Sequence, residues 1–261
     1  MSKFDQLSVI LPTLNEKKNL EYLIPEIVEV LKSEKIFDHE IIVVDDGSTD
    51  GTAELIDSLN NKNFKICFIE NKPPLNLPLS INKGIESSNF RNVMWLDADG
   101  SMGSNAVLKM IKEIKQYPDS VFIGSRFVSG GGYKGQKEDD SETLFRVIKN
   151  IINSEDSILA VYLSKLFNNL LKVLLNSSVN DITSGFIIGK KEYFNSNCFV
   201  DSIYGEYFIK VISDLEKNDI NIFEIGYFCT PRQFGESKTS SSYLRLFKLA
   251  LPYLKAALNY R

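Results

Sequence analysis

Two aspartates separated by one residue are the strongest candidates for chemistry in this sequence. Asp97 and Asp99 flank Ala98, directly after the apolar run NVMWL and before a loop of small residues. In an extended loop both carboxylates can approach one hard cation that bridges two phosphates, and such a cation neutralises charge as a diphosphate departs. Aspartate-rich turns after strands are common, so the pair predicts a metal site only if other polar groups converge on it.

Two further polar clusters follow apolar runs in the same way. Pro12–Glu16 follows LSVIL, and Asp45–Ser48 follows EIIVV. In an open α/β sheet, ligands bind outside the carboxyl ends of the strands. Asp45 or Asp46 can accept a hydrogen bond from a nucleotide base or a ribose hydroxyl, although helix capping is an ordinary use of such a turn and is all that we expect of Asp50. Convergence of three clusters predicts one site at one sheet edge.

Strand-like and helix-like segments alternate along the chain. Short apolar runs suit strands buried on both faces of a parallel sheet, and the stretches between them have apolar residues at helical spacing. We expect strands at 7–11, 40–44, 64–69, 92–96, 120–123, 186–189 and 221–228, and helices at 18–33, 52–60, 79–86, 106–116, 158–175 and 204–217. Pro12 should close the first strand, and Asn15–Glu16 should cap the first helix. This order predicts an α/β fold with a mostly parallel sheet flanked by helices.

The second half of the chain departs from this pattern. After Gly130–Gly132 we expect a mobile insertion at 133–160, and we divide the chain into a domain of residues 1–238 and a helical tail of residues 239–261. From residue 237 onward there are five basic residues and no acidic one. The tail has apolar residues at helical spacing, namely Leu244, Phe247, Leu251, Leu254 and Leu258. Such an amphipathic helix, interrupted at Pro252, suits an anionic membrane surface, and packing on the domain or on a second subunit is the alternative.

Composition and charge exclude several classes of protein. The chain has 261 residues, 43% of them hydrophobic, and a net charge of -4, which argues against a nucleic-acid partner. The single histidine, His39, lies in a polar turn where we expect it to be exposed, so a Ser-His-Asp triad and a histidine-rich zinc site are excluded.

The cysteines and the hydropathy pattern bear on the compartment. Cys67, Cys198 and Cys229 share no metal-ligand spacing, and we expect them to be reduced core residues of a cytosolic protein. No apolar run reaches the roughly 18 residues of a membrane span. We therefore expect a cytoplasmic protein that is soluble or peripheral on the cytoplasmic face of a membrane.

Six segments occur in an order that resembles one enzyme family. They span most of the chain and read SVILPTLNEKKNL, EIIVVDDGSTDGT, WLDADGS, GSRFVSGGG, DITSGF and PRQFGESK. The series resembles the family 2 glycosyltransferases and, within them, the polyprenyl- or dolichyl-phosphate mannose or glucose synthases. The resemblance implies a GT-A fold, a donor such as GDP-mannose or UDP-glucose, Mg2+ or Mn2+, a polyprenyl phosphate acceptor, and inversion at the anomeric carbon.

The resemblance also implies a nucleotide pocket and a metal site. The residues that match the nucleotide pocket are Pro12, Asn15, Glu16, Asp45 and Asp46. Asp97 and Asp99 match the metal and donor-sugar carboxylates, and Ser101 stands where many relatives have a side chain near the metal.

Four more residues match groups that contact phosphates. Arg126 and Ser184 resemble residues that face the acceptor phosphate, and Arg232 and Lys238 resemble cations over the donor diphosphate and the acceptor phosphate. A phosphate acceptor is largely ionised, so it needs cations to position it and no strong general base. The absence of a catalytic histidine is consistent with this chemistry.

Other functions stay open beside this one. A saccharide or protein acceptor is one alternative, and a saccharide would need a carboxylate base, for which Glu206 and Asp181 are the candidates. A non-catalytic partner protein that keeps the fold is another, and a homo-oligomer is left open. A nucleotidyltransferase or a dinucleotide oxidoreductase would carry a glycine-rich loop after the first strand, and LPTLNE is not such a loop.

Overall fold

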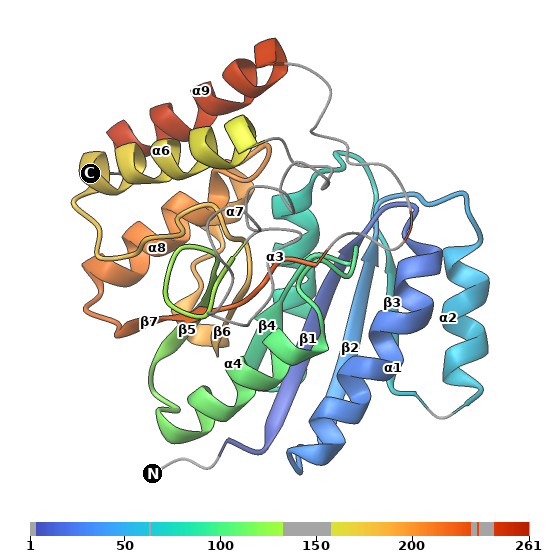
Figure 1. Ribbon diagram of the computed structural model, residues 1–261. Coiled ribbons are helices and arrows are strands. Elements are labelled where there is room, and N and C mark those ends of the chain that lie inside the picture. Colours follow the sequence, from blue (N-terminus) through green and yellow to red (C-terminus); the bar gives the residue numbers. More distant parts are fainter. Residues whose placement is uncertain (1–3, 63, 133–157, 231–233, 235–242, 261) are drawn as a thin grey trace.

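One mixed sheet organises the chain. The computed structural model describes residues 4–62, 64–132, 158–230, 234 and 243–260, with the backbone alone for 158–161 and 243–249. Within these residues the sheet has seven strands in the order β3-β2-β1-β4-β6-β5-β7 (Figure 1). The strands are β1 (Gln6–Thr13), β2 (Asp38–Asp45), β3 (Ile66–Glu70), β4 (Asn92–Trp95), β5 (Val121–Ser125), β6 (Ile187–Lys190) and β7 (Ile222–Gly226). Strand β6 runs antiparallel to β4 and β5, and the other pairs are parallel, which confirms the mostly parallel sheet.

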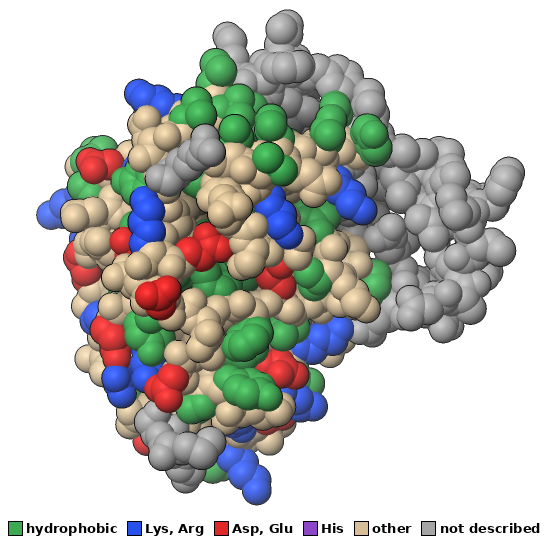
Figure 2. Space-filling view, turned by 90° about the vertical axis from the view of Figure 1, so that its left-hand side faces the viewer, with side chains coloured by type: hydrophobic (Ala, Val, Ile, Leu, Met, Phe, Trp, Pro, Cys, Tyr) green, Lys and Arg blue, Asp and Glu red, His purple; other side chains and the backbone are tan. Residues whose placement is uncertain are grey.

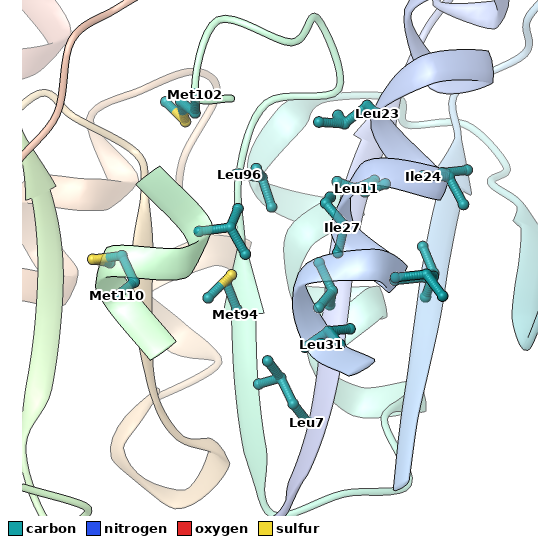
Figure 3. Close-up of a cluster of buried hydrophobic side chains, with 14 of the residues drawn as sticks. Leu7, Leu11, Leu23, Ile24, Ile27, Leu31, Met94, Leu96, Met102 and Met110 are labelled. Atoms are coloured by element: carbon teal, nitrogen blue, oxygen red, sulfur yellow. The ribbon is translucent and has the colours of Figure 1, made fainter. Parts of the chain in front are cut away.

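Helices cover both faces of this sheet. They are α1 (Lys17–Ser33), α2 (Thr52–Asn60), α3 (Leu77–Ser87), α4 (Ser104–Gln116), α6 (Ile158–Leu175), α7 (Asn197–Val200), α8 (Tyr207–Lys217) and α9 (Tyr243–Asn259), with a 3-10 turn at Lys191–Tyr193. Successive side chains of a strand point to opposite faces. Leu7, Val9 and Leu11 of β1 accordingly join the core with α1, α2 and α4, while Ile10 joins the core with α3 and α6–α9. Figure 3 shows the first core, where Ile27 and Leu31 of α1 face the β1 side chains.

The first strand and the first helix meet differently from the expected boundary. Pro12 lies inside β1 instead of closing it, which is possible because its ring nitrogen needs no partner at the end of the ladder. Glu16 takes the N-cap position of α1 but makes no side-chain cap hydrogen bond. Asp50 caps α1 instead, because its Oδ2 accepts from Lys17 N at 2.9 Å. Its Oδ1 accepts from Thr52 N, at the start of α2, at 3.2 Å. The capping role expected for Asp50 is confirmed, and it serves two helices.

Two expectations about burial are wrong. His39 is 7% exposed, because β2 begins at Asp38 and draws the ring into the sheet, where Nδ1 lies 2.8 Å from Ile36 O. Burial lowers the pKa of His39. Cys67 is exposed and Cys229 is half-buried, so only Cys198 is a core residue, and burial raises the pKa of its thiol to about 12. His39 lies at the amino-terminal end of β2, opposite the end where the ligand clusters were expected.

The C-terminal helix packs on the domain through Leu254 of the expected stripe and through Tyr253, Ala256 and Ala257 beside it. Helix α9 runs on through Pro252 and contacts α6 and α8. Ala256 and Ala257 are buried against the domain, so packing holds the helix together at the proline. Leu251 and Leu258 of the expected apolar stripe are 65% and 63% exposed. The insertion expected at 133–160 falls largely outside the described residues, since α6 begins at Ile158.

Candidate active site

A cleft of about 680 Å³ lies at the carboxyl edge of the sheet. Its walls come from residues that follow β1, β2, β4, β5 and β7, and from Thr183 and Ser184 before the antiparallel β6, which begins at the same edge. Of the expected site residues it contains Pro12, Glu16, Asp46, Asp97, Asp99, Ser101, Arg126 and Ser184. The three clusters that follow β1, β2 and β4 therefore meet at one edge, as their places in the sequence predict.

The two aspartates of the Asp-x-Asp pair share one wall of the cleft. Asp97 is half-buried and Asp99 is 5% exposed, and Asp99 Oδ1 accepts from Ser101 N at 2.9 Å. Gly100, which lies between Asp99 and Ser101, has φ +76°, a backbone conformation that residues with a side chain rarely adopt. Thr230 closes the loop from outside, because its N donates to Ser101 O at 2.9 Å and its Oγ1 to Gly100 O at 2.8 Å. We call residues 97–101 the metal loop.

This loop has the donor set that a hard divalent cation takes when it binds together with phosphates. Among the described residues no three His, Cys, Asp or Glu side chains gather as a metal-binding group. The protein would thus supply the carboxylates of Asp97 and Asp99, and diphosphate oxygens and water would fill the other positions. Mg2+ commonly binds in this way, through one or two carboxylates and substrate phosphates. The residues present fit Mg2+ or Mn2+.

Asp45 and Asp46 have different places at the end of β2. Asp45 is buried, and its Oδ2 accepts from Gly47 N at 3.1 Å and Ser48 N at 2.8 Å, so it holds the turn and does not line the cleft. Asp46 lines the cleft, and its Oδ1 accepts from Ser80 Oγ at 2.6 Å and from Asn71 Nδ2 at 3.0 Å. Both neighbours restrain the carboxylate and were missed from sequence. Asn71 carried a usable signal, because it directly follows β3 at the same sheet edge.

Asn15 is likewise used within the fold, while Glu16 faces the cleft. The N–H of Asn15 donates to Ser48 Oγ at 2.7 Å, and its Oδ1 accepts from Thr49 N at 2.8 Å. Asn15 thereby ties the loop after β1 to the turn after β2, at φ +56°. Glu16 lines the cleft, and its Oε2 accepts from Asn19 Nδ2 at 2.6 Å. The structure therefore brings Glu16, but not Asn15 or Asp45, into the cleft wall.

Arg126 is fixed on the opposite wall by a buried ion pair. Its Nε donates to Asp181 Oδ2 at 2.8 Å and its Nη2 to Asp181 Oδ1 at 2.7 Å, while the side chain of Asp181 is 0% exposed. Nη2 also donates to Thr183 Oγ1 at 3.0 Å. Glu224 of β7 holds the other side of Asp181 by accepting from its N–H at 2.9 Å. Such a bidentate pair orients the plane of the guanidinium as well as its charge.

Two carboxylates considered as general bases are engaged elsewhere. Asp181 is bonded to the guanidinium of Arg126 and does not line the cleft. Glu206 is buried and accepts from Ile203 N at 2.7 Å and Tyr204 N at 2.9 Å, which shapes a loop whose residues 203 and 204 do line the cleft. Both side chains therefore support cleft walls instead of facing a substrate.

The remaining expected residues divide into one that is placed and two that are not. Ser184 is 7% exposed, lines the cleft near Arg126, and accepts from Phe186 N through its Oγ at 3.3 Å. Arg232 and Lys238 lie outside the described residues. Their described neighbours are Thr230, bonded to the metal loop, and Phe234, whose carbonyl accepts from Asn19 Nδ2 at 3.3 Å.

The cleft also has apolar walls that the sequence did not single out. Leu75 and Leu77 flank Asn76 at the start of α3, where Asn76 Oδ1 caps the helix by accepting from Leu79 N at 2.9 Å. Tyr227 closes the floor and is 3% exposed. These residues come from segments with no polar motif, so periodicity showed them only as core or loop.

No helix among the described residues is long and apolar enough to cross a bilayer.

The fold and the cleft define a transferase of the GT-A class, with an Asp-x-Asp pair at the carboxyl edge of a mostly parallel sheet. The chain belongs to glycosyl transferase family 2, whose family profile matches residues 8–197. This is the family that the resemblance of its motifs implied.

Two curated relatives carry names that specify a lipid phosphate or prenol. A "Dolichol-phosphate mannosyltransferase" of Pyrococcus furiosus is 34% identical over 126 residues, which is 48% of this chain and 34% of that protein. A "Polyprenol monophosphomannose synthase" of Mycolicibacterium smegmatis is 26% identical over 250 residues, 93% of this chain and 84% of that protein. The matched part spans only about a third of the Pyrococcus protein's length.

Solved structures share the fold at low identity. Glucosyl-3-phosphoglycerate synthase from Mycobacterium tuberculosis, in complex with Mn2+, UDP and glucosyl-3-phosphoglycerate, has a TM-score of 0.63 at 16% identity and covers 98% of this chain and 80% of its own. The same enzyme in complex with Mg2+ and UDP also has a TM-score of 0.63. These likenesses confirm the GT-A fold.

Proposed function

We propose that this glycosyltransferase moves a hexose from a nucleotide sugar to a polyprenyl phosphate. The observation that carries the proposal is the placement of Asp97 and Asp99 on one wall of the cleft and Arg126 on another. Carboxylates that suit a metal–diphosphate complex thus share one cavity with a cation that suits a second phosphate. The names of the two curated relatives support the lipid phosphate as the acceptor, with mannose from GDP-mannose or glucose from UDP-glucose as the transferred sugar.

The donor half of the cleft is suited to a nucleoside diphosphate. The carboxylate of Asp46, restrained by Asn71 and Ser80, can accept from a ribose hydroxyl or a base N–H. Asp97 and Asp99 would hold Mg2+ or Mn2+, which supplies charge neutralisation to the departing diphosphate. The solved neighbours bind UDP with Mn2+ or Mg2+, which supports this use of a metal.

The acceptor half needs charge and orientation. An acceptor phosphate oxygen attacks the anomeric carbon, the bond from that carbon to the donor diphosphate breaks, and the nucleoside diphosphate leaves with the electron pair. Attack from the face opposite the leaving group inverts the anomeric centre. Arg126 would orient the acceptor phosphate with Ser184 beside it, and Arg232 and Lys238 are proposed as further cations. No proton has to be removed from an ionised phosphate, so the engagement of Asp181 and Glu206 in the cleft walls favours this acceptor over a saccharide.

An exposed apolar face supports peripheral contact with an anionic membrane on its cytoplasmic side. Helix α6 exposes a row of residues at helical spacing, namely Tyr162, Leu163, Leu166, Leu170 and Val173. The neighbouring α9 adds Leu251 and Leu258 (Figure 1), and Figure 2 shows hydrophobic side chains gathered along the upper edge of this side of the molecule. The exposed Lys165 and Lys255 lie on the same two helices. We call this surface the α6–α9 face.

The three described cysteines are free thiols, which agrees with the proposed location in a reducing compartment.

A donor screen tests the proposal. Purified protein with Mn2+ and polyprenyl phosphate is given GDP-mannose or UDP-glucose, and the lipid fraction is assayed for labelled sugar. We expect a glycosylated lipid phosphate from one donor, and none when a chelator is in excess. Transfer to added saccharide with no lipid product from either donor would contradict the proposed acceptor.

A further inference from the structure

One buried amide joins Glu16 to Phe234, and Glu16 belongs to the side of the cleft proposed to hold the donor, which we call the donor wall (Glu16, Asp46, Asp97 and Asp99). Asn19 of α1 is 7% exposed, and its Nδ2 donates to Glu16 Oε2 at 2.6 Å and to Phe234 O at 3.3 Å. An amide nitrogen has two protons, so these two bonds use its donor capacity. Glu16 lines the cleft, whereas Asn19 does not. The side chain of Asn19 therefore acts on the cleft through its neighbours.

The ring of Phe234 packs against two side chains of the same helix, α1. It stacks on Tyr22 with ring centroids 5.8 Å apart and 17° between the planes, and Lys18 Nζ lies 5.6 Å from its centroid. Residues 18, 19 and 22 are spaced to lie on one side of a helix. Stacked rings and cation–π contacts both favour a defined position over a loose apolar contact. Helix α1 thus holds the backbone and the side chain of Phe234.

The metal loop holds the chain just before Phe234. Thr230 bonds to Ser101 O and Gly100 O, four residues upstream of Phe234. Asn19, Tyr22, Asp99 and Gly100 also line one small hollow of about 40 Å³, so α1 and the metal loop face each other. Thr230 is consequently fixed to the metal loop, and Phe234 is fixed to α1.

We propose that Asn19 is a positioning residue for the donor, which sets the place of Glu16 in the cleft wall relative to the anchored Phe234. The inference rests on the proposed function, because the effect of Asn19 is expected on the binding of a nucleoside diphosphate together with a metal ion. Loss of the amide leaves the Glu16 carboxylate and the Phe234 carbonyl without their shared donor. The donor wall then loses its attachment to Phe234, and nucleotide affinity falls.

A double-mutant cycle measures this role. UDP and GDP, each with Mn2+, are titrated calorimetrically into wild type, Asn19→Ala, Phe234→Ala and the double variant. We expect Asn19→Ala to weaken binding of the preferred nucleotide about tenfold, the range of one hydrogen bond to a charged group. Phe234→Ala should weaken it by a similar factor, because the carbonyl that Asn19 contacts is then no longer anchored by the ring. Because both changes release the same attachment, we expect the double variant to be little worse than either single one. Independent effects would multiply to about a hundredfold.

Two further variants separate positioning from general destabilisation. Phe234→Tyr keeps the ring and should bind as wild type. Asn60→Ala removes two side-chain to backbone hydrogen bonds with Ile66, as a matched loss far from the cleft, and should lower the melting temperature without changing nucleotide affinity. If Asn19→Ala does not fold, the pair Phe234→Ala and Phe234→Tyr decides by the same criterion.

The outcomes distinguish this inference from the proposed function. Wild-type affinity in Asn19→Ala and Phe234→Ala, equal weakening by Phe234→Ala and Phe234→Tyr, or a hundredfold effect in the double variant would overturn the positioning role alone. A wild-type protein that binds neither nucleotide with Mn2+ would overturn the proposed function, and this inference with it.

Discussion

The donor wall and the acceptor wall of the cleft are built in different ways. The metal loop and the turn after β2 are held by hydrogen bonds with backbone or neutral side chains, such as those from Thr230 to Ser101 O and Gly100 O and from Asn71 and Ser80 to Asp46. Arg126 is held by the buried carboxylate of Asp181, and the N–H of Asp181 is held by Glu224. A wall held by hydrogen bonds from neutral groups tolerates loss of a functional side chain better than a wall held by a buried ion pair, where function and stability depend on the same residues. Substitutions should therefore separate activity from stability on the donor side and affect both on the acceptor side.

The largest effect on activity should come from the metal loop. Asp99→Ala removes a proposed metal ligand, and we expect transfer to fall by about 10³-fold or more, the scale of a lost electrostatic contribution at a reacting centre. Asp97→Ala should be nearly as severe. The melting temperature should shift by only a few degrees, since the two bonds from Thr230 to Ser101 O and Gly100 O stay in place. Thermal unfolding and sugar transfer measured on the same samples check both parts, and full activity in Asp99→Ala would refute the metal site.

The acceptor wall should show the largest effect on stability. Asp181→Ala leaves the guanidinium of Arg126 without its buried partner, and breaking such a pair costs about 3–5 kcal/mol. We expect a lower free energy of unfolding in urea together with strongly reduced transfer. Asp46→Asn, a carboxylate change on the donor side, is the control and should lose activity with little change in stability. Equal stability losses in the two variants would break the contrast between the walls.

Arginine geometry at the acceptor wall gives a smaller effect. Arg126→Lys keeps the charge but loses the fork that bonds both oxygens of Asp181 and Thr183. We expect kcat/KM for the lipid phosphate to fall by about tenfold to a hundredfold, with nucleotide affinity unchanged. Kinetics that vary both substrates measure this. A rise in KM for the donor alone would mean that Arg126 acts on the donor and would contradict its assignment to the acceptor phosphate.

The sequence predicted the cleft where a motif follows a strand and failed where the partner is remote. Asp97, Asp99 and Asp46 were found because parallel strands bring their carboxyl ends together. Asp45 could not be separated from Asp46, since the choice between holding the turn and facing the cleft depends on side-chain direction. The pairing of Arg126 with Asp181 follows from the antiparallel entry of β6, which hydrophobic runs do not encode.

Burial was harder to predict than secondary structure. His39 was expected in a polar turn, but β2 begins at Asp38, two residues before the expected strand, and His39 is buried in it. The stripe of leucines in α9 was found, but of its described side chains Leu251 and Leu258 are exposed, and only Leu254 packs on the core, beside Tyr253, Ala256 and Ala257. A hydrophobic pattern shows that a helix is amphipathic and leaves open which partner covers it.

The smallest effect concerns the α6–α9 face. Leu166→Ser with Leu170→Ser, and separately Leu251→Ser with Leu258→Ser, remove apolar side chains that are 46–65% exposed. We expect each pair to reduce flotation with anionic vesicles severalfold while stability and nucleotide binding stay unchanged. Phe37→Ser, at an exposed phenylalanine on the far end of the sheet, is the control. Unchanged flotation in both double variants would exclude this face as the membrane contact.

The comparison of polyprenyl phosphate with polyprenol tests the account most directly. Both lipids have the same chain, and only the first presents the charged head that Arg126 is proposed to orient. With the preferred donor and Mn2+, the account predicts transfer to polyprenyl phosphate, none above background to polyprenol, and loss of transfer in Arg126→Ala. Equal transfer to both lipids, or transfer to the phosphate that survives in Arg126→Ala, would contradict it.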